Sequence, residues 1–489
     1  MTLRYKIIDT KNNHYLFDPV TTKLVLANGL MLEIMKNYSN EQQIETLRKE
    51  HKDFDRYYSY IGDMIKSGMF SHQTEHNVSG EINYLSSPAA TLLIVLTGRC
   101  NLRCEYCVYN DKYPHEISYS NDDMKMEIAT KAINQFFEIY NAKRNNGYFK
   151  KPTIMFYGGE PLIKFDLIKE IVSYIEQLGY DCDYYMTTNG LLLNKEYSKF
   201  LVMNDFRLTF SLDGYRWNHD RNRVDISGCP TYERVVENIK KYEEIRIAAN
   251  KDTITSFNCC YDDYTDLEEC VKVFTDLGEL IKPFFVLYSY ISPYDTTYYE
   301  WLDKKAKANG WEKCFSDSYY RIKQRFVSGL VESSVEKAAI QSLFSSFYFT
   351  DIRSTAKEAS PLNKCCVPLT KLAVYPDGTY TICERMNKKL PIGDVYHGLD
   401  WQRISQITNL MEKVFSDGNC SKCDFRKMCN VCFQFMDEKG KISPEYCERS
   451  KRSIRQQLKE YCELREQYPD IVEKFRPDGE SWKIINILA

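Results

Sequence analysis

The chain has 489 residues, 18 cysteines and a formal net charge of −3. This length allows two to four domains, and the near-neutral charge lacks the basic field typical of nucleic-acid-binding proteins, so we expect no nucleic-acid partner. The first residues lack the apolar core of a signal peptide, and no apolar run approaches membrane-spanning length. We therefore expect a cytoplasmic protein with no membrane association, in which so many cysteines indicate metal or redox chemistry rather than disulfides.

Residues 1–75 are predicted to form a small domain of three short strands followed by three helices. The strand candidates are Tyr5–Ile8, Tyr15–Asp18 and Leu24–Ala27, and helical spacing follows, most clearly over Glu41–Lys49 and Phe54–Lys66. This order resembles the winged-helix domain of many peptide maturases, which implies capture of a leader peptide as an added strand beside the third helix. A DNA-binding winged helix is the alternative, but the last helix lacks clustered Lys and Arg. The polar segment 76–90 is predicted to be a linker.

From Thr91 onward, apolar strands alternate with amphipathic helices, which is typical of a parallel sheet. The strand candidates are Leu92–Leu96, Thr153–Tyr157, Tyr184–Thr188, Arg207–Ser211, Thr255–Cys259 and Phe284–Tyr290. We expect them to form a barrel over residues 91–320, with the active site at the carboxyl ends of the strands. Helices are expected to bridge residues 321–360 to the segment that follows.

Three cysteines follow the first of these strands directly: Cys100, Cys104 and Cys107. An odd number of thiols at such short spacing cannot pair off as disulfides. Three thiolates can hold three irons of a four-iron cluster and leave the fourth iron open. Zinc is the competing metal, but structural zinc sites usually have four protein ligands, and no fourth Cys or His lies nearby.

The Cys-x3-Cys-x2-Cys spacing after the first strand, with Tyr106 before the last cysteine, resembles the signature of the radical S-adenosylmethionine (AdoMet) superfamily. The resemblance implies a partial (β/α)6 barrel and a [4Fe-4S] cluster whose unique iron chelates AdoMet. Reduction of that cluster cleaves AdoMet to a 5′-deoxyadenosyl radical, so the cofactor supplies the difficult chemistry and the protein positions it.

Three further motifs follow the second, third and fourth strands. By the resemblance, Gly158, Gly159 and Glu160 contact the AdoMet amino group, and the two glycines allow close backbone approach. Thr188 and Asn189 are expected to face the cofactor, and Ser211 and Asp213 to lie near its ribose and carboxylate. Because Asn-Gly and Asp-Gly also form turns, ordinary strand-end turn chemistry is the alternative for Thr188, Asn189 and Asp213.

A second group of cysteines lies in residues 361–450. Its pattern is Cys366-x11-Gly378-x4-Cys383, then Cys420-x2-Cys423-x5-Cys429-x2-Cys432, and then Cys447. The order resembles the SPASM domain, which carries two auxiliary [4Fe-4S] clusters, although the spacing from Cys429 to Cys432 is one residue shorter than in the family. A closed zinc site of Cys420, Cys423, Cys429 and Cys432 is the rival.

The family pattern assigns Cys420, Cys423, Cys429 and Cys447 to the distal auxiliary cluster. Cys366, Cys383 and Cys432 remain for the proximal cluster, and Cys365 is a possible fourth ligand. With three ligands, one iron would stay open to a substrate thiolate. Glu384 occupies the position of a catalytic aspartate in anaerobic sulfatase maturases, which makes it a candidate base; a surface glutamate is the alternative.

The sequence thus predicts an α/β radical AdoMet enzyme with a C-terminal helix and tail at 451–489. We expect three [4Fe-4S] clusters, a precursor-peptide substrate with a leader, and a low-potential reductant such as flavodoxin or ferredoxin. A thioether cross-link from a substrate Cys is the first hypothesis, because an open iron suits a thiolate. Carbon–carbon or carbon–oxygen cross-linking and formylglycine formation are the alternatives within the superfamily. A non-catalytic iron–sulfur electron-transfer protein is the alternative outside it.

Overall fold

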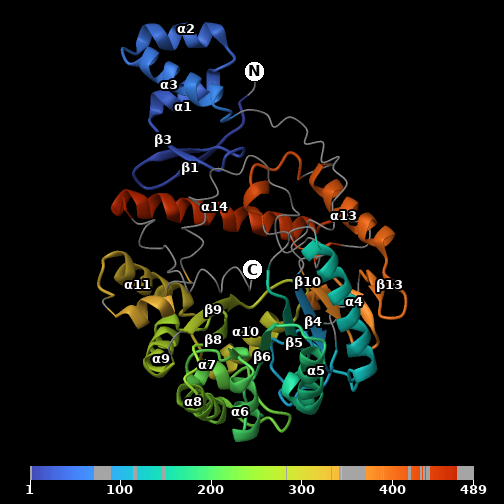
Figure 1. Cartoon of the computed structure of the whole chain (residues 1–489). Helices are drawn as coiled ribbons and strands as arrows, with labels where there is room; N and C mark the ends of the chain where they lie inside the picture. Colours follow the sequence, from blue (N-terminus) through green and yellow to red (C-terminus); the bar gives the residue numbers. More distant parts are fainter. Residues whose placement is uncertain are drawn as a thin grey trace. The chain divides into compact units, whose positions relative to one another are not determined.

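The computed structural model (Figure 1) describes most of the chain. The described residues are 3–70, 90–113, 118–145, 150–281, 284–331, 333–340, 343, 371–386, 388, 390–416, 420–429, 432, 435–436 and 441–470. Cys365, Cys366 and nearly all of the predicted linker lie outside these residues. The chain divides into two compact units, one with its described residues in 3–70 and 408–470, the other with its described residues in 90–343 and 371–407.

The N-terminal strands and helices lie close to where the sequence predicts them. An antiparallel sheet in the order β1-β2-β3 is followed by three helices. Their bounds are β1 (Lys6–Asp9), β2 (His14–Phe17), β3 (Leu24–Ala27), α1 (Gly29–Asn37), α2 (Glu41–Glu50) and α3 (Phe54–Lys66). Asn28 and Asn40 cap α1 and α2 by accepting hydrogen bonds from backbone N–H groups of the first turns. The apolar faces of the helices enclose a core that includes Leu16, Ile34 and Ile61.

The same unit contains a cysteine-bearing loop and a long C-terminal helix. The bounds are η5 (Arg426–Met428) and α14 (Pro444–Gln467), and α13 (Trp401–Ser416) includes residues of both units. The last helix was predicted within residues 451–489, but it begins earlier, at Pro444. Proline suits the first turn of a helix because it has no N–H to leave unpaired. This earlier start places Cys447 in the first turns of α14.

The second unit contains six parallel strands with helices between them, which confirms the predicted α/β class. The strands are β4 (Thr91–Val95), β5 (Thr153–Tyr157), β6 (Asp183–Thr188), β7 (Arg207–Ser211), β8 (Thr255–Tyr261) and β9 (Phe284–Tyr290). The helices are α4 (Met126–Asn145), η1 (Pro161–Lys164), α5 (Phe165–Gln177), α6 (Lys195–Met203), α7 (Arg216–Asp220), α8 (Tyr232–Ala248), α9 (Leu267–Leu280), α10 (Tyr298–Asn309) and α11 (Phe315–Val327). Helices α4, α5, α6 and α8 cover the outside of the strands (Figure 1). Burial on both faces explains the continuous apolar run of β4.

The sheet continues beyond the six predicted strands. The added strands are β10 (Lys371–Val374), β11 (Thr379–Thr381), β12 (Gly393–Asp394) and β13 (Gly398–Leu399), and the order is β13-β12-β11-β10-β4-β5-β6-β7-β8-β9. Strand β10 pairs in parallel with β4, with Lys371 opposite Thr91 and Val374 opposite Ile94. The 3-10 turn η4 (Glu384–Met386) follows β11. The segment that contains Cys383 and Glu384 is therefore anchored to the strand that leads into the first cysteine loop.

Candidate metal centre and active site

Cys100, Cys104 and Cys107 lie together in the loop after β4. Cys104 is buried and the other two are partly buried. Burial, with the nearby Glu160 and Cys107, raises the pKa of Cys100 to about 12. Burial also raises the pKa of Cys104 well above its usual value, and the neighbouring Cys107 and Cys100 add to the rise. Three shielded thiols, two of which have their pKa raised further by a neighbouring thiol, form a site that a cationic centre would stabilise as thiolates.

Backbone hydrogen bonds to the segment that follows α7 hold this loop in place, in the manner of strand pairing. The N–H of Arg103 donates to the carbonyl of Val224 at 2.8 Å, and the N–H of Glu105 donates to the carbonyl of Asn222 at 2.9 Å. Leu102 also forms an isolated antiparallel bridge with Asp225. The shape of the cysteine loop is therefore fixed by residues that follow β7, more than a hundred positions later in the chain.

Each of the three sulfur atoms faces an N–H donor. The backbone of Leu102 donates to Cys100 Sγ at 3.4 Å, and that of Tyr109 donates to Cys107 Sγ at 3.5 Å. Arg223 Nη1 lies 3.8 Å from Cys104 Sγ. Such bonds stabilise thiolates and help to set the potential of an iron–sulfur cluster, so this donor set fits a cluster held by the three cysteines.

A single metal ion fits the described residues less well. Within the part of the chain that the structure describes, no three Cys, His, Asp or Glu side chains gather closely enough to hold one ion. A structural zinc ion needs four ligands within about 2.0–2.3 Å of one point. A four-iron cluster binds each thiolate through a different iron and requires no such convergence. The spacing of the described thiols is compatible with a cluster of several irons.

Gly158 and Gly159 bring the end of β5 against the cysteine loop. The N–H of Gly159 donates to the carbonyl of Thr97 at 2.9 Å, and that of Glu160 donates to the carbonyl of Arg99 at 3.0 Å. A Cβ atom on Gly158 would lie 2.6 Å from the Thr97 carbonyl oxygen, and one on Gly159 would lie 2.2 Å from that of Arg99. Only glycine permits this approach of two backbones.

Glu160 joins the ends of β5 and β6. Its carboxylate accepts hydrogen bonds from the Thr188 hydroxyl at 2.7 Å and from the backbone N–H groups of Asn189 at 2.8 Å and Leu162 at 3.0 Å. Both Glu160 and Thr188 are only 1% exposed. Glu160 and Thr188 therefore fix the backbone beside the cysteine loop. Asn189 Nδ2 donates to Asn101 Oδ1 at 2.8 Å and lies 3.9 Å from Cys100 Sγ.

Asp213 is fully buried and bonded to protein groups on both oxygens. Oδ2 accepts from the Tyr106 hydroxyl at 2.5 Å and from Arg223 Nε at 3.0 Å, and Oδ1 accepts from the Cys260 N–H at 3.0 Å. The contacts give Asp213 a positioning role, because it holds Arg223 beside Cys104. Ser211 is 8% exposed, and its hydroxyl makes no hydrogen bond to any residue that the structure describes, so it is available to a ligand.

Arg223 is a site residue that the sequence did not reveal. It lies in a polar segment after the Ser211–Gly214 motif, with no metal-ligand or strand-end spacing. Its burial against an acidic residue could have been inferred only from the fold. Burial opposes its charge, but Asp213 and Tyr106 outweigh this, so the pKa of Arg223 is raised well above its usual value. The arginine therefore supplies a fixed positive charge next to a candidate cluster ligand.

The second cysteine group brings four thiols together. Burial, with the nearby Cys447, Cys423 and Cys429, raises the pKa of Cys420 to about 11. The pKa of Cys447 is raised by burial and then by Cys429 and Cys423. These are the four cysteines that the family pattern assigns to the distal auxiliary cluster. Cys432 lies in the same unit and Cys383 in the other, and Cys365 and Cys366 are outside the described residues. The ligand set of the proximal cluster remains a prediction.

Glu384 directly follows Cys383 in the chain, and Tyr157 ends β5, near both Cys383 and Cys107. The Glu384 carboxylate is 3.4 Å from Lys371 Nζ, and its backbone carbonyl accepts from the Tyr375 hydroxyl at 2.9 Å. Burial raises the pKa of Tyr157, and the nearby Glu384, Cys107 and Cys383 raise it further. Tyr157 therefore lies within electrostatic reach of cysteines from both groups.

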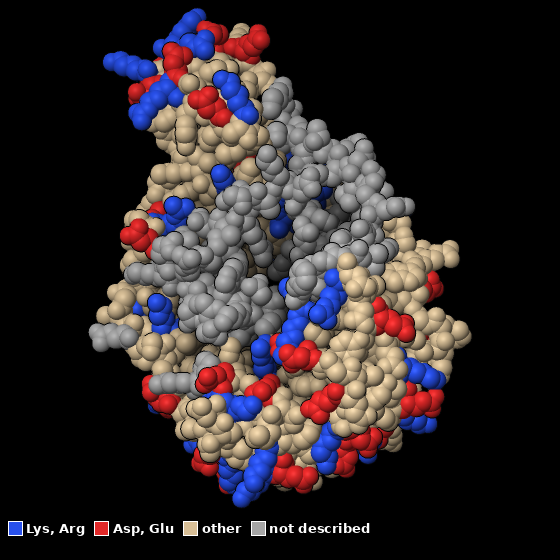
Figure 2. Space-filling model, viewed as in Figure 1, with Lys and Arg blue, Asp and Glu red and all other residues tan. Residues whose placement is uncertain are grey.

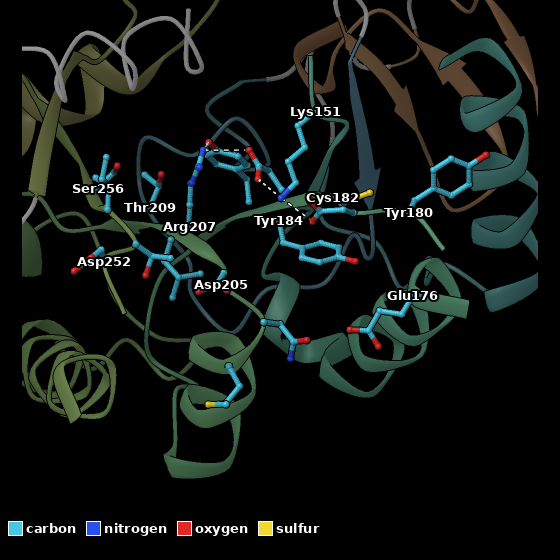
Figure 3. Close-up of a pocket in the computed structure, with 18 residues that line it drawn as sticks. Lys151, Glu176, Tyr180, Cys182, Tyr184, Asp205, Arg207, Thr209, Asp252 and Ser256 are labelled. Atoms are coloured by element: carbon cyan, nitrogen blue, oxygen red, sulfur yellow. Dashed lines mark hydrogen bonds and ion pairs between the residues drawn. The ribbon is translucent and has the colours of Figure 1, made fainter. Parts of the chain in front are cut away.

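A cavity of about 630 Å³ lies at the opposite end of the strands (Figure 3). Lys151 precedes β5, and Asp183 and Arg207 begin β6 and β7. Lys151 pairs with Asp181 at 2.7 Å and with Asp183 at 3.2 Å, so its charge is already compensated. Since catalysis in barrels of this type occurs at the carboxyl ends of the strands, this cavity is not the candidate active site.

A comparison with known families identifies the domain that contains the first cysteine loop. Residues 94–258, which include the cysteine loop and the ends of β5, β6 and β7, match the sequence model of the Radical SAM superfamily. These residues form a radical SAM domain. The superfamily implies one [4Fe-4S] cluster and AdoMet, the cofactors that the three-cysteine loop fits.

Curated relatives resemble mainly this radical SAM domain. A cysteine-type anaerobic sulfatase-maturating enzyme of Clostridium novyi (strain NT) is 28% identical over 166 residues, which are 33% of this chain and 42% of that protein. The radical SAM cyclopropyl synthase TigE of Paramaledivibacter caminithermalis is 27% identical over 175 residues, 34% of this chain and 36% of that protein. The chain spans about two fifths of the length of the first of these relatives.

Solved structures extend the likeness beyond the radical SAM domain. Polyhistidine-tagged anSMEcpe with bound AdoMet covers 79% of this chain and 96% of its own, with a TM-score of 0.54 and 18% identity. Native anSMEcpe with bound AdoMet covers 78% and 99%, with a TM-score of 0.52 and 17% identity. At this identity the match shows the fold alone, and that fold agrees with the predicted α/β radical SAM barrel.

Proposed function

We propose that the chain is a radical AdoMet maturase that installs a cross-link in a ribosomally made precursor peptide. The observation that carries this proposal is the combination of two separate cysteine groups in one chain. One is the buried triad at the carboxyl end of β4, inside the radical SAM domain. The other is the group of four coupled thiols in the other unit. An enzyme that only cleaved AdoMet would need the first group alone.

The cofactors would be held by residues already described. Cys100, Cys104 and Cys107 would bind three irons of the radical cluster, and Gly158, Gly159, Asn189 and Ser211 would contact AdoMet. When bound and reduced, this pair supplies a 5′-deoxyadenosyl radical that abstracts hydrogen from the substrate. The protein fixes the loop through Glu160, stabilises Cys104 through Arg223, and keeps the triad away from water by burial.

The auxiliary sites would prepare the substrate. Cys420, Cys423, Cys429 and Cys447 would hold the distal cluster, and Cys366, Cys383 and Cys432, with or without Cys365, the proximal one, for three clusters in total. If three thiolates hold the proximal cluster, its open iron can take a substrate thiolate, and thioether formation follows as the preferred outcome. Glu384, held by Lys371, is the candidate base. Carbon–carbon or carbon–oxygen cross-linking and formylglycine formation are the alternatives.

The N-terminal domain would recognise the leader of the precursor peptide. Within the described residues, strand β3 pairs only with β2 and leaves its other edge open, and Leu26 on this strand is 56% exposed. An extended peptide can add to such an edge. On the face shown in Figure 2, acidic and basic side chains of the described residues are interspersed, which does not favour nucleic acid as the partner.

A low-potential flavodoxin or ferredoxin is the proposed electron source, and the proposed location is the cytoplasm. Among the described helices, none is long and apolar enough to cross a bilayer.

The decisive test is AdoMet cleavage by the reconstituted protein. The wild type should contain about twelve irons per chain and form 5′-deoxyadenosine under reducing conditions. The triple variant Cys100→Ala, Cys104→Ala and Cys107→Ala should form none, while it retains about eight irons. Cleavage by the triple variant would refute the assignment. A wild type that binds iron but never cleaves AdoMet would instead support the rival electron-transfer function.

A further inference from the structure

The N-terminal domain packs directly on the loop that carries three of the four proposed distal ligands, Cys420, Cys423 and Cys429; the fourth, Cys447, lies on α14. Arg4 Nε lies 2.7 Å from Asp424 Oδ1, and Lys6 Nζ lies 2.9 Å from Asp424 Oδ2. Asp424 directly follows Cys423 in the chain. Arg4 and Asp424 are only 16% and 17% exposed, so this pair is better shielded from water than an ordinary surface salt bridge. Two cations of the N-terminal segment therefore clamp a residue adjacent to a proposed cluster ligand.

An apolar contact seals the same interface. Leu16 and Phe17 are neighbours on β2, both are fully buried, and successive side chains on a strand point to opposite faces. Leu16 belongs to the core of the N-terminal domain, whereas Phe17 stacks on Phe425 with 5.7 Å between ring centroids. Phe425 is 2% exposed and also lies under the guanidinium of Arg455 on α14. The second face of the small sheet is thus covered by the distal cysteine loop.

Polar contacts extend the interface on either side of this apolar centre. Lys427 Nζ donates to the carbonyl of Val20, and the Thr10 hydroxyl donates to Glu466 Oε1 at 2.7 Å. The described residues of the cysteine loop form short turns and the 3-10 helix η5, as in the bond from the Cys423 N–H to the Cys420 carbonyl at 3.1 Å. Its shape therefore depends on what packs against it, and on one side that is the N-terminal sheet.

We infer that docking of the N-terminal domain and loading of the distal cluster stabilise each other. Four thiolates on a cluster carry net negative charge, and Arg4 and Lys6 bring positive charge to their border through Asp424. A loaded cluster fixes the loop that presents Asp424 and Phe425, and the docked sheet in turn fixes the loop for the cluster. Such a coupling is reciprocal by thermodynamic necessity, so it must be measurable in both directions. The inference rests on the proposed assignment of the distal cluster.

The effect of the cluster on the domain can be measured by hydrogen–deuterium exchange. We compare the reconstituted wild type with the full-length double variant Cys420→Ala and Cys447→Ala. Exchange in β1 and β2 should be at least fivefold faster in the variant, while exchange in β5 of the barrel, the internal control for global unfolding, should not change. Equal rates in β1 and β2 of the two proteins would overturn the inference.

The effect of the domain on the cluster is tested with a charge variant that leaves the cysteine loop untouched. Arg4→Gln with Lys6→Gln removes two charges at the interface. The matched control, Arg48→Gln with Lys66→Gln, removes two charges from α2 and α3, whose partners are local. Both pairs are made in the background that lacks Cys100, Cys104 and Cys107. A chelator should extract about four irons several-fold faster from the interface variant than from the control, and equal rates in the two would overturn the inference.

Iron counts separate failure of this inference from failure of the assignment on which it rests. If the double variant Cys420→Ala and Cys447→Ala holds as much iron as the wild type, the proposed distal cluster is wrong, and the coupling is wrong with it. If the variant loses about four irons but exchange in β1 and β2 is unchanged, the cluster assignment stands and only the coupling is wrong.

Discussion

Arg223 and Asp213 form a salt bridge that is closed off from solvent, with 3.0 Å between Nε and Oδ2 and side chains 7% and 0% exposed. The same guanidinium reaches the sulfur of Cys104 at 3.8 Å. One buried cation thus contacts both a strand-end carboxylate of the barrel and a proposed iron ligand. Changes to this pair should affect both the fold and the cluster.

Arg223→Met should lower the free energy of unfolding by about 3–5 kcal/mol, because it leaves the Asp213 carboxylate buried without its cation. Adding Asp213→Asn removes that uncompensated charge, so the double variant should be more stable than Arg223→Met alone. Denaturant unfolding of the metal-free proteins measures both effects. The single variant Asp213→Asn completes the comparison. If the stability losses of the two single variants simply added up to that of the double variant, the two residues would act independently.

Gly159→Ala should disrupt the cysteine loop. The new Cβ would lie 2.2 Å from the Arg99 carbonyl oxygen, and backbone cannot yield as a flexible side chain can. We expect the reconstituted variant to lose about four irons per chain and all AdoMet cleavage. Gly29→Ala is the matched control, because a Cβ there meets nothing within 4 Å. If Gly159→Ala retained its full iron content, the close contact would not be essential to the site.

Glu160→Gln should weaken AdoMet binding by about tenfold or more without abolishing folding. The carboxylate accepts from three donors, and an amide nitrogen would face at least one of them with a hydrogen of its own. An unsatisfied buried donor costs about 1–3 kcal/mol. Isothermal titration of the cluster-loaded protein with AdoMet measures the change. Glu138→Gln, on the barrel helix α4, serves as the control and should bind AdoMet as the wild type does.

His219 should make the stability of the barrel fall at acidic pH. It is fully buried, and burial followed by the charge of Arg223 lowers its pKa well below the usual value. Below the unfolded-state pKa of about 6.5, the His219 imidazole binds a proton in the unfolded chain but stays neutral in the folded chain. This contribution to stability is therefore present above about pH 6.5 and is lost as the pH falls toward the folded-state pKa, by up to about 1.4 kcal/mol per unit.

The comparison with His219→Gln isolates this effect from all other titrations. The variant should be less stable at pH 7.5, because Gln replaces the contacts with the Asp213 N–H and the Thr231 hydroxyl only imperfectly. The stability gap to the wild type should narrow by about 1 kcal/mol between pH 7.5 and pH 5.5. If the difference in stability between the wild type and the variant were the same at pH 7.5 and pH 5.5, His219 would take up its proton in the folded state as well.

The strands and the cysteine triad could be predicted because they depend on local pattern. Strands β5, β7 and β9 have the predicted bounds, since buried parallel strands are short apolar runs that end at turn residues. The metal-binding role proposed for Cys100, Cys104 and Cys107 follows from spacing, because thiolates this close in sequence can face a common centre. The same holds for the end of β5, where two adjacent glycines indicated a close backbone approach.

The contacts that complete the site could not be predicted in this way. Nothing in the sequence near Cys104 points to Arg223, and nothing near β4 points to Lys371–Val374, which pairs with it across almost three hundred positions. The resemblance implied that Glu160 and Asp213 lie at the cofactor, and only the fold adds that both are hydrogen-bonded to protein groups.

The sequence by itself determined the α/β class, the order of the strands and the candidates for metal-binding cysteines, because hydrophobic periodicity and ligand spacing act over a few residues. Only the tertiary structure decided that Asp424 meets Arg4 and that Phe425 covers Phe17. Those pairs join segments some four hundred residues apart, and their energies depend on burial and on the exact approach of charges and rings. Such quantities arise only when the chain is packed, so a local pattern cannot encode them.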